Sequence, residues 1–386
     1  MAAIIGFAHS RFGKLEEDDL ETLIARTARE AVEHAGIGFA DIDQIYVGNF
    51  GGFEKQSFPA AFALDADPGL RFKPAVRVEN ACATGSAAVH LAAGATDGGV
   101  SRIVLVVGAE KMTVTPSEEV GDVLLNASYR KEEGDTPGGF AGVFGRIAEL
   151  YFQRHGDQSA AMARIAAKNH RNGVANPLAQ LRKDLGFHFC NTISDKNPLV
   201  AGPIRRTDCS LVSDGAAALV MTDDATALTF PRAVRIRGRA HVQDFLPMSR
   251  RDIIAFEGCR VAWDRAHALA GTRLEDLSLV ETHDCFTIAE LIEYEAMGLT
   301  PPGGGAQAIE EGWTEKEGRL PVNPSGGLKS KGHPIGATGV SMHVMASLQL
   351  LEEAGDMQVN DPTLAGIFNM GGAAVANYVS ILERVR

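Results

Sequence analysis

One cysteine lies at a point in the sequence where a thiol can act as a nucleophile. Cys82 follows the strand-like run 76–78 and precedes the small residues 83–88, which are typical of a buried helix. Backbone N–H groups at a helix start have no partner within the helix, and the helix dipole adds partial positive charge there. Both effects predict a lowered pKa for the Cys82 thiol. The alternative is that Cys82 is only a small buried hydrophobic residue, as free cysteines often are.

A second reactive group, His283-Asp284-Cys285-Phe286, directly follows the strand-like run 277–280. The turn after a strand is where α/β sheets present ligand sites. An imidazole N–H can stabilise an oxyanion, and a thiol can exchange a proton with a substrate. We therefore predict that His283 and Cys285 are catalytic. The alternative is that Asp284 caps the following helix, with the histidine and cysteine incidental.

A third group surrounds His333 in the glycine-rich stretch 323–339. Pro334 stiffens the chain just after the histidine, and an imidazole in this place can accept the proton of a nucleophilic thiol. The two lysines in this stretch do not make a phosphate-binding P-loop, because no GxxxxGK[ST] string is present. The density of glycine and proline around a single histidine favours a functional loop over a plain surface loop.

A fourth group, 368–374, places Gly371 and Gly372 between two strand-like runs. Glycines between strands suit an exposed backbone N–H, and we predict that Gly371 supplies one half of an oxyanion hole. A tight hairpin without a catalytic role is the alternative.

The elements that would position these groups alternate between strand and helix, and each half repeats the order of the other. In each half a reactive residue, followed by glycine and small residues, precedes a buried helix, over 82–88 and again over 333–339. This weak similarity predicts a duplicated α/β unit with two covered sheets. The predicted strands are 2–8, 45–47, 76–78, 103–107, 216–221, 233–239, 277–280, 365–369 and 375–382, and the predicted helices are 18–35, 86–95, 259–270, 288–297 and 340–354.

Residues 115–207 differ from the rest of the chain in carrying more charge, several asparagines and prolines, and weaker periodicity. We predict that they form an inserted loop domain with helices near 143–153 and 158–172. The first half is then residues 1–114 together with 208–229, and the second half is 230–386.

The composition excludes several classes of protein. The 386 residues are 45% hydrophobic and 22% charged, which is typical of a soluble globular chain, and the net charge of −12 argues against nucleic acid as a partner. A local basic patch can still bind an anionic small molecule. One candidate for phosphates, with a solvated helix face as the alternative, is the cluster of Arg164, Lys168, Arg171, Arg182 and Lys183.

The five cysteines include no CxxC pair and no Cys/His cluster at zinc spacing. We therefore predict no metal site, no disulfide framework and a reducing compartment, the cytoplasm. No secretory signal pattern and no apolar run long enough to span a membrane are present in the sequence.

Taken together and in this order, the four groups resemble the thiolase superfamily over almost the whole chain. Most thiolases carry Asn-Glu-Ala-Phe where this sequence has His283-Asp284-Cys285-Phe286, and the latter form is similar to the sterol-carrier-protein type thiolases and their bacterial and archaeal relatives. The resemblance implies a five-layered αβαβα thiolase fold with the site between the halves, and a homodimer or homotetramer. It implies acyl-CoA substrates, with no permanently bound cofactor.

One departure from the superfamily concerns a second catalytic cysteine, which most thiolases hold in a Cys-x-Gly motif. The matching stretch here is Asn369-Met370-Gly371, so that cysteine is missing. In the subgroup that this sequence resembles, the cysteine of the His-Asp-Cys-Phe motif takes over, which makes Cys285 the acid/base.

The resemblance also implies the roles of the remaining site residues in an acyl-CoA thiolase that forms or cleaves 3-ketoacyl-CoA. Cys82 is the nucleophile and His333 accepts its proton. His283, directly or through a held water, and His333 stabilise the thioester oxyanion, while the N–H groups of Cys82 and Gly371 stabilise the tetrahedral intermediate at the acyl-cysteine.

Three alternatives remain at this stage. A ketoacyl-synthase-like condensing enzyme is disfavoured, because a decarboxylating enzyme has no need of an α-proton base such as Cys285. An enzyme that works with an OB-fold partner protein is closer, either as a thiolase that hands acetoacetyl-CoA onward or as a retro-aldolase acting on steroid side-chain CoA esters. A non-catalytic protein that binds acyl-CoA or lipid is disfavoured by the complete set of reactive residues.

Overall fold

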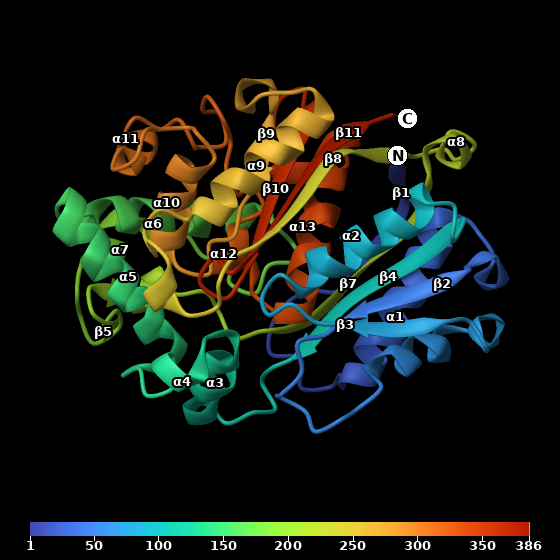
Figure 1. Cartoon of the computed structure of the whole chain (residues 1–386), viewed down its shortest axis with the longest axis horizontal. Helices are drawn as coiled ribbons and strands as arrows, with labels where there is room; N and C mark the ends of the chain where they lie inside the picture. Colours follow the sequence, from blue (N-terminus) through green and yellow to red (C-terminus); the bar gives the residue numbers. More distant parts are fainter. Residues whose placement is uncertain (386) are drawn as a thin grey trace.

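Nine strands form the centre of the molecule in the computed structural model, which describes residues 1–385 (Figure 1). Their order in the sheet is β3-β2-β4-β7-β1-β8-β11-β10-β9, and a separate two-stranded hairpin pairs β5 with β6. The strands are β1 (Ala2–His9), β2 (Gln44–Gly48), β3 (Ala75–Val78), β4 (Ile103–Lys111), β5 (Leu199–Ala201), β6 (Ile204–Arg205), β7 (Asp214–Asp223), β8 (Val234–Gln243), β9 (Leu279–Glu281), β10 (Leu364–Gly371) and β11 (Ala376–Arg384).

The strand pairings repeat from one half of the chain to the other, as the sequence predicts. In the first half β1 and β7 pair antiparallel, β7 and β4 antiparallel, and β4 and β2 parallel. In the second half β8 and β11, β11 and β10, and β10 and β9 repeat these three pairings. The predicted two sheets are joined into one, because β1 and β8 pair over Ala3–Arg235 and Ile4–Val234.

The helices cover this sheet in layers. They are α1 (Leu20–Ala35), α2 (Thr84–Asp97), α3 (Ser117–Leu124), α4 (Arg130–Glu133), α5 (Gly139–His155), α6 (Ser159–Ala175), α7 (Gly186–Asn191), α8 (Asp224–Ala227), α9 (Glu257–Ala270), α10 (Thr287–Ala296), α11 (Gly305–Glu310), α12 (Gly327–Lys331) and α13 (Ile335–Leu350). Helices α2 and α13 pack together in the middle of the molecule, with α1 on the outer face of the first half and α9 on that of the second.

The side chains of β4 show how a continuous apolar strand serves two layers. Leu105 and Val107 belong to the core under α1, whereas Val104 and Val106 belong to the core shared with α2 and α13. Successive residues of a strand point to opposite faces, so a strand buried on both faces must be apolar throughout. The resulting order of helix, sheet, paired helices, sheet and helix is the five-layered arrangement that the family resemblance implies.

The start of α13 differs from the prediction. The sequence analysis places a glycine-rich loop over 323–339 and a helix from 340, but α12 lies within that loop and α13 begins at Ile335, directly after Pro334. Glycines lower helix propensity, which is why the pattern reads as a loop. Here they are needed for close packing: a Cβ on Gly336 would lie 2.4 Å from Ala109 O, and one on Gly339 would lie 2.1 Å from Ser86 N.

The chain between β4 and β7 holds α3 to α7 and the β5–β6 hairpin. The predicted helices near 143–153 and 158–172 correspond to α5 and α6. Helix α5 extends beyond the prediction at both ends, whereas α6 extends beyond it only at its C-terminal end. The boundaries of an inserted domain at 115 and 207 stay a prediction. Within residues 1–385, no helix is both long and apolar enough to cross a membrane.

We predict that Gly339→Ala destabilises the protein by roughly 1–3 kcal/mol, because the added methyl group overlaps the backbone of α2. The measurement is the free energy of unfolding by urea titration. Gly94→Ala is the matched control, since Gly94 is exposed on α2 and a Cβ there meets nothing within 4 Å. That variant should be about 0.5–1 kcal/mol more stable. Equal effects of the two substitutions would contradict the packing role of Gly339.

Candidate active site

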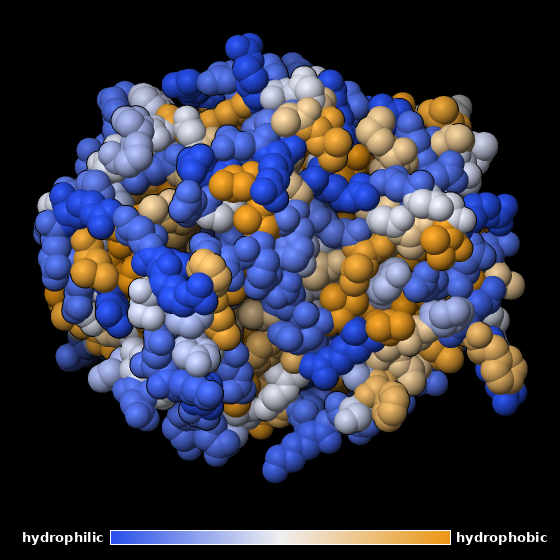
Figure 2. Space-filling model, viewed as in Figure 1, coloured by the Kyte–Doolittle hydropathy of each residue, from blue (hydrophilic) through white to orange (hydrophobic). Residues whose placement is uncertain are grey.

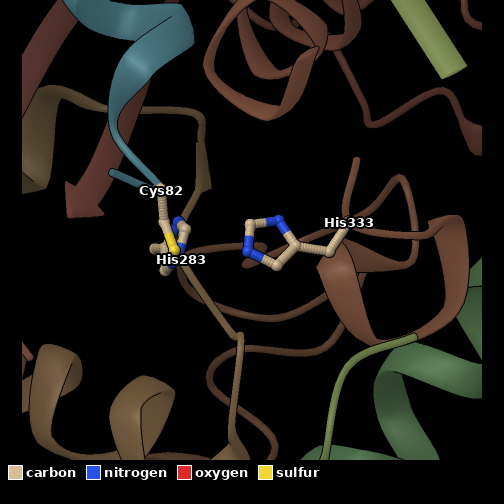
Figure 3. Close-up of side chains that lie close together, drawn as sticks. All are labelled: Cys82, His283 and His333. Atoms are coloured by element: carbon tan, nitrogen blue, oxygen red, sulfur yellow. The ribbon is translucent and has the colours of Figure 1, made fainter. Parts of the chain in front are cut away.

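Three reactive side chains from both halves meet at one place (Figure 3). Cys82 lies between β3 and α2, His283 between β9 and α10, and His333 just before α13. The Cys82 sulfur and one ring nitrogen of each histidine all lie within 4.8 Å of one another. The two imidazoles pack edge to face, with centroids 5.2 Å apart. Cysteine and histidine side chains also bind zinc, so the prediction that this protein has no metal site stays a prediction.

A cavity of about 430 Å³ gives access to this cluster. Cys82, Cys285 and His333 line it, so the fourth predicted side chain joins the other reactive groups. His283 is fully buried and is not among the residues that line the cavity. The rest of the wall includes Met112, Val120, Leu124, Phe140, Val200, Arg206, Ser210, Leu211, Val212 and Phe286. An apolar cavity with a few reactive groups at its end suits a substrate with an acyl chain.

The Cys82 thiol is protonated at rest, which corrects the prediction of a lowered pKa. Burial raises its pKa to about 12 and outweighs the backbone N–H groups of Gly372 and of Cys82 itself, which lower it. The thiol precedes α2, as predicted, but it is only 3% exposed. The free-energy cost of removing the thiolate from water therefore exceeds the stabilisation that the thiolate gains at the helix start. The Gly372 amide at the sulfur is adjacent in sequence to Gly371, whose part in an oxyanion hole stays a prediction.

His333 is arranged to accept a proton. Its Nδ1 lies 2.7 Å from the Thr338 hydroxyl oxygen, and that hydroxyl donates to the Pro334 carbonyl at 3.0 Å. Because the hydroxyl has a single proton, it accepts from Nδ1–H, which leaves Nε2 as the acceptor. Burial and, to a lesser degree, Lys331 lower the pKa of His333 to about 3. The imidazole is therefore neutral, and its free lone pair is on Nε2.

Cys285 holds its proton more firmly than an ordinary thiol. Burial, and then the nearby Cys82, raise its pKa well above the usual value. Its backbone carbonyl accepts a hydrogen bond from Ser210 N at 2.8 Å, which ties this turn to the chain entering β7. A protonated thiol facing the cavity can act as an acid first and as a base once it has lost that proton.

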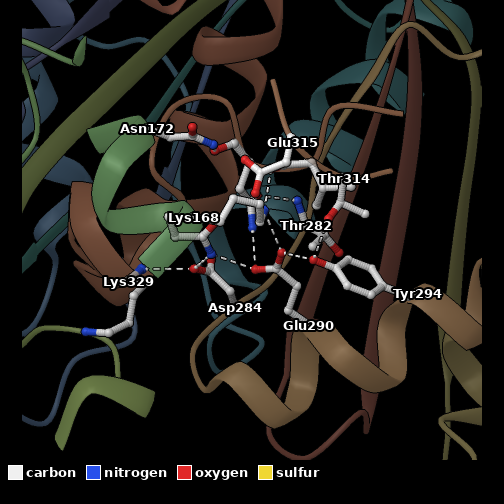
Figure 4. Close-up of polar contacts among 12 residues, drawn as sticks. Lys168, Asn172, Thr282, Asp284, Glu290, Tyr294, Thr314, Glu315 and Lys329 are labelled. Carbon is white, nitrogen blue, oxygen red and sulfur yellow. Dashed lines mark hydrogen bonds and ion pairs between the residues drawn. The ribbon is translucent and has the colours of Figure 1, made fainter. Parts of the chain in front are cut away.

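A buried polar network holds the loops that carry these residues (Figure 4). The Asp284 carboxylate accepts from Leu328 N at 2.6 Å, Lys329 N at 3.1 Å and Asn169 Nδ2 at 2.8 Å. Asn169 also donates to Glu290, which in turn bonds to Lys168 at 2.8 Å. The turn after β9, helix α12 and helix α6 are thereby connected, so Asp284 does cap a helix, but it is α12 rather than the helix that follows it in sequence.

The sequence analysis missed the part of this network that comes from α6. Asn169 and Asn172 lie on α6 and Asn176 directly follows its last residue, and the latter two donate to the carbonyls of Asn323 and Ser325 at 3.0 and 2.9 Å. Their spacing of three and four residues was the available signal. Polar residues on one helix face are usually solvated, and only the fold reveals that these are buried against the 323–331 segment.

The basic cluster suggested for phosphates does not form one site. Lys168 is fully buried and bonds to Glu290 and to the Val322 carbonyl. Arg171 pairs with Glu315, and the Arg164 guanidinium lies over the Phe187 ring at 4.5 Å. Arg206, which the cluster did not include, is instead the basic residue on the cavity wall.

Comparison with known proteins agrees with this geometry. Residues 2–185 match the thiolase N-terminal domain, and residues 240–384 match a thiolase C-terminal domain-like family. The chain belongs to the thiolase family. As a thiolase it is an acyltransferase of that type.

Individual relatives cover nearly the whole chain. It is 34% identical to an acetyl-CoA acetyltransferase of Methanothermobacter thermautotrophicus, over 99% of both chains. It is 31% identical to sterol carrier protein 2 of Bos taurus, over 96% of this thiolase and 70% of that protein. A structure of an Ltp2-ChsH2(DUF35) aldolase has the same fold, with a TM-score of 0.84 at 20% identity over 100% of this chain and 98% of that one.

We predict that alkylation of Cys82 by iodoacetamide accelerates about tenfold per pH unit from pH 7 to 10, without a plateau. Only the thiolate reacts, and a pKa of about 12 keeps the thiolate a minor species over this range. The rate is measured by mass spectrometry of the Cys82 peptide, with Cys82→Ala as the control for other thiols. A plateau near neutral pH would mean that a thiolate–imidazolium pair already exists in the free enzyme.

Proposed function

We propose that this thiolase forms or cleaves 3-ketoacyl-CoA through an acyl group held on Cys82. The observation that carries the proposal is that Cys82, Cys285 and His333 line one cavity. A nucleophile, a base for its proton and a second acid/base are what two successive acyl transfers between thiols and a carbon acid require.

In the first half-reaction, Cys82 Sγ attacks the thioester carbon and His333 Nε2 accepts the thiol proton. The N–H groups of Cys82 and of the Gly371–Gly372 turn stabilise the tetrahedral intermediate on Cys82, while His283 and the protonated His333 stabilise the thioester oxygen of the second acyl-CoA when it becomes an enolate. The bond between the acyl carbon and the CoA sulfur breaks, and Cys285 donates its proton to the departing thiolate. The acyl group is then on Cys82, His333 is protonated, and Cys285 is a thiolate.

In the second half-reaction, the Cys285 thiolate removes an α-proton from a second acyl-CoA. The resulting carbanion attacks the acyl carbon, and the bond from that carbon to Cys82 breaks. The Cys82 sulfur recovers its proton from His333, so every residue returns to its starting state. Thiolysis runs through the same steps in reverse.

Arg206 is the residue that we propose binds the anionic part of CoA. It is exposed, lines the cavity and has no ion-pair partner among the described side chains. CoA carries several phosphate charges, and a guanidinium binds phosphate through paired hydrogen bonds. A local cation of this kind is needed on a protein whose net charge is −12.

A partner-dependent retro-aldolase is the second candidate, and the fold likeness to the Ltp2-ChsH2(DUF35) aldolase is what favours it. An aldol cleavage does not place an acyl group on cysteine, whereas this cavity holds both thiols of the two-step acyl transfer. We therefore rank thiolysis or condensation first, and an OB-fold partner protein is compatible with either candidate.

The setting that we propose is acyl-CoA and lipid metabolism in the cytoplasm. All five cysteines are free thiols. A mechanism that needs two of them reduced suits a reducing compartment.

We also propose that the enzyme is a homodimer paired through the edge strand β3. At the other end of the sheet, residues 321–323 cover β9, with Val280 N bonded to Pro321 O at 2.9 Å. No described strand covers β3 in this way, and Phe58, Phe72 and Val76 nearby are 83%, 85% and 50% exposed. Figure 2 shows hydrophobic atoms gathered over the side where Figure 1 places β2, β3 and β4. An open, apolar strand edge is a template for pairing with a second copy.

We predict that mixing with acetyl-CoA adds the mass of one acetyl group to the wild type and none to Cys82→Ala. Cys285→Ala should still be acylated, but its condensation rate should fall at least roughly a hundredfold, because the α-proton base is gone. Intact-protein mass and 3-ketoacyl-CoA formation are the measurements, run with and without a chelator and repeated with longer acyl-CoAs. Absence of an adduct with every acyl-CoA would reject the proposed function.

We predict that Val76→Glu converts the dimer to a monomer, because a two-fold interface repeats each new charge beside its copy. Light scattering coupled to size-exclusion chromatography gives the molar mass. Leu269→Glu is the control, because Leu269 is 65% exposed on α9, which covers the second half of the chain, whereas β3 belongs to the first half. This substitution should leave the molar mass unchanged. A dimer that survives Val76→Glu would show that β3 is not the interface.

A further inference from the structure

Asn369 is a buried residue of β10 that touches two of the site residues. In the resemblance to the superfamily it matches the second catalytic cysteine of most thiolases, and in the structure it is 0% exposed. Its side-chain Nδ2 lies 3.1 Å from the Cys82 carbonyl oxygen and 2.8 Å from His283 Nδ1. An amide that contacts the nucleophile's backbone and a catalytic imidazole is well placed to control how that imidazole is protonated.

The Cys82 carbonyl determines which way the amide of Asn369 faces. A carbonyl oxygen only accepts hydrogen bonds, so the atom of Asn369 beside it must be the NH₂ nitrogen. That nitrogen has two protons, and the second is directed to His283 Nδ1. His283 Nδ1 must then be the acceptor in this bond. In a neutral imidazole the proton is therefore on Nε2.

His283 Nε2 is left as a buried N–H without a partner among residues 1–385. A buried donor without an acceptor is costly, on the order of 1–3 kcal/mol, unless a ligand supplies the acceptor. The adjacent His333 holds the opposite tautomer, since Thr338 takes its Nδ1–H. The edge-to-face pair of imidazoles thus offers one N–H donor and one lone pair.

We propose that Asn369 is a positioning residue that fixes His283 in its Nε2–H tautomer, so that His283 can donate to the thioester oxygen. This inference rests on the proposed function for the identity of the acceptor. Asn369 does not touch the reacting atoms itself. Loss of the donor that it maintains should therefore lower kcat more than it changes KM, as removal of an oxyanion-hole donor does.

The first experiment reads the tautomer directly in the wild-type protein. The chain is labelled with ¹⁵N-histidine, and the His283 signals are assigned by their loss in His283→Gln. In neutral imidazole the protonated and unprotonated nitrogens have well-separated shifts, so the Nε2–H form is recognised without any assay of activity. A wild-type His283 protonated on Nδ1 overturns the proposal, whatever the variants do.

Substitution of Asn369 supplies the functional test. Asn369→Asp keeps the shape but offers only acceptors, so it should convert His283 to the Nδ1–H tautomer and lower kcat roughly a hundred- to a thousandfold. Asn369→Ala leaves Nδ1 without a partner and both tautomers accessible, so its kcat should fall less. A purely structural role predicts the reverse order, because the cavity left by alanine is more damaging than the isosteric aspartate. That reverse order would overturn the proposal.

Asn377→Asp is the matched control. Asn377 is a buried asparagine on the neighbouring β11 whose amide donates only to backbone carbonyls, including that of Ala374 at 3.0 Å. Its substitution should lower the stability and leave the His283 tautomer unchanged.

Acylation of wild-type Cys82 by acyl-CoA is measured on the same samples. A correct tautomer without acylation would contradict the proposed function, and acylation with the other tautomer would contradict the role of Asn369.

Discussion

The close contact between α2 and α13 is the constraint on which the site depends. A Cβ on Gly85 would lie 2.7 Å from Val340 N, and one on Gly339 would lie 2.1 Å from Ser86 N, so the two helices meet backbone to backbone. One helix comes from each half of the duplicated chain. Because Cys82 lies just before α2 and His333 just before α13, this contact brings the Cys82 thiol and the His333 imidazole together. Duplication supplies two similar strand-to-helix turns, and glycine lets them approach.

Buried carboxylates then fix the loops on either side of that contact. Glu110 at the end of β4 accepts from Gly336 N at 3.0 Å and Phe50 N at 2.8 Å, which ties the first turn of α13 to the first half. Asp284 does the same between the turn after β9 and α12. Charged groups without solvent are retained only where several donors satisfy them. The hydrogen-bond networks at the strand ends therefore hold the reactive side chains in position. Both networks are buried, as the reactive side chains are.

A turn from strand to helix is a local feature of the sequence, so the catalytic candidates Cys82, His283, Cys285 and His333 could all be predicted from the residues around them. The alternation of elements also predicted the repeat and the covered sheets, whereas the five layers were implied by the family resemblance. The start of α13 was placed five residues late, since a glycine that serves a close contact has the same appearance in sequence as a glycine in a loop.

Properties of the site that depend on distant residues could not be read in the same way. The pKa of Cys82 was expected to be low from the helix start alone, but it is set by how completely the fold excludes water from the sulfur. The tautomers of the two histidines depend on Thr338 and Asn369, and the second of these is far from His283 in sequence. The sequence pattern predicts that Lys168 binds phosphate or lies on a solvated helix face, but in the fold it is buried beside Glu290.

These electrostatics lead to a site whose reactive groups are uncharged before substrate binds. Burial keeps both thiols protonated and both imidazoles neutral. In the proposed mechanism, charge appears only when an acyl-CoA arrives and Cys82 passes its proton to His333. In a cavity with little water, an oxyanion forming at that moment interacts strongly with any fixed N–H donor. In the proposed mechanism His283 Nε2–H is a neutral donor that is already oriented and unpaired, and such a donor stabilises a charged transition state more than an uncharged ground state.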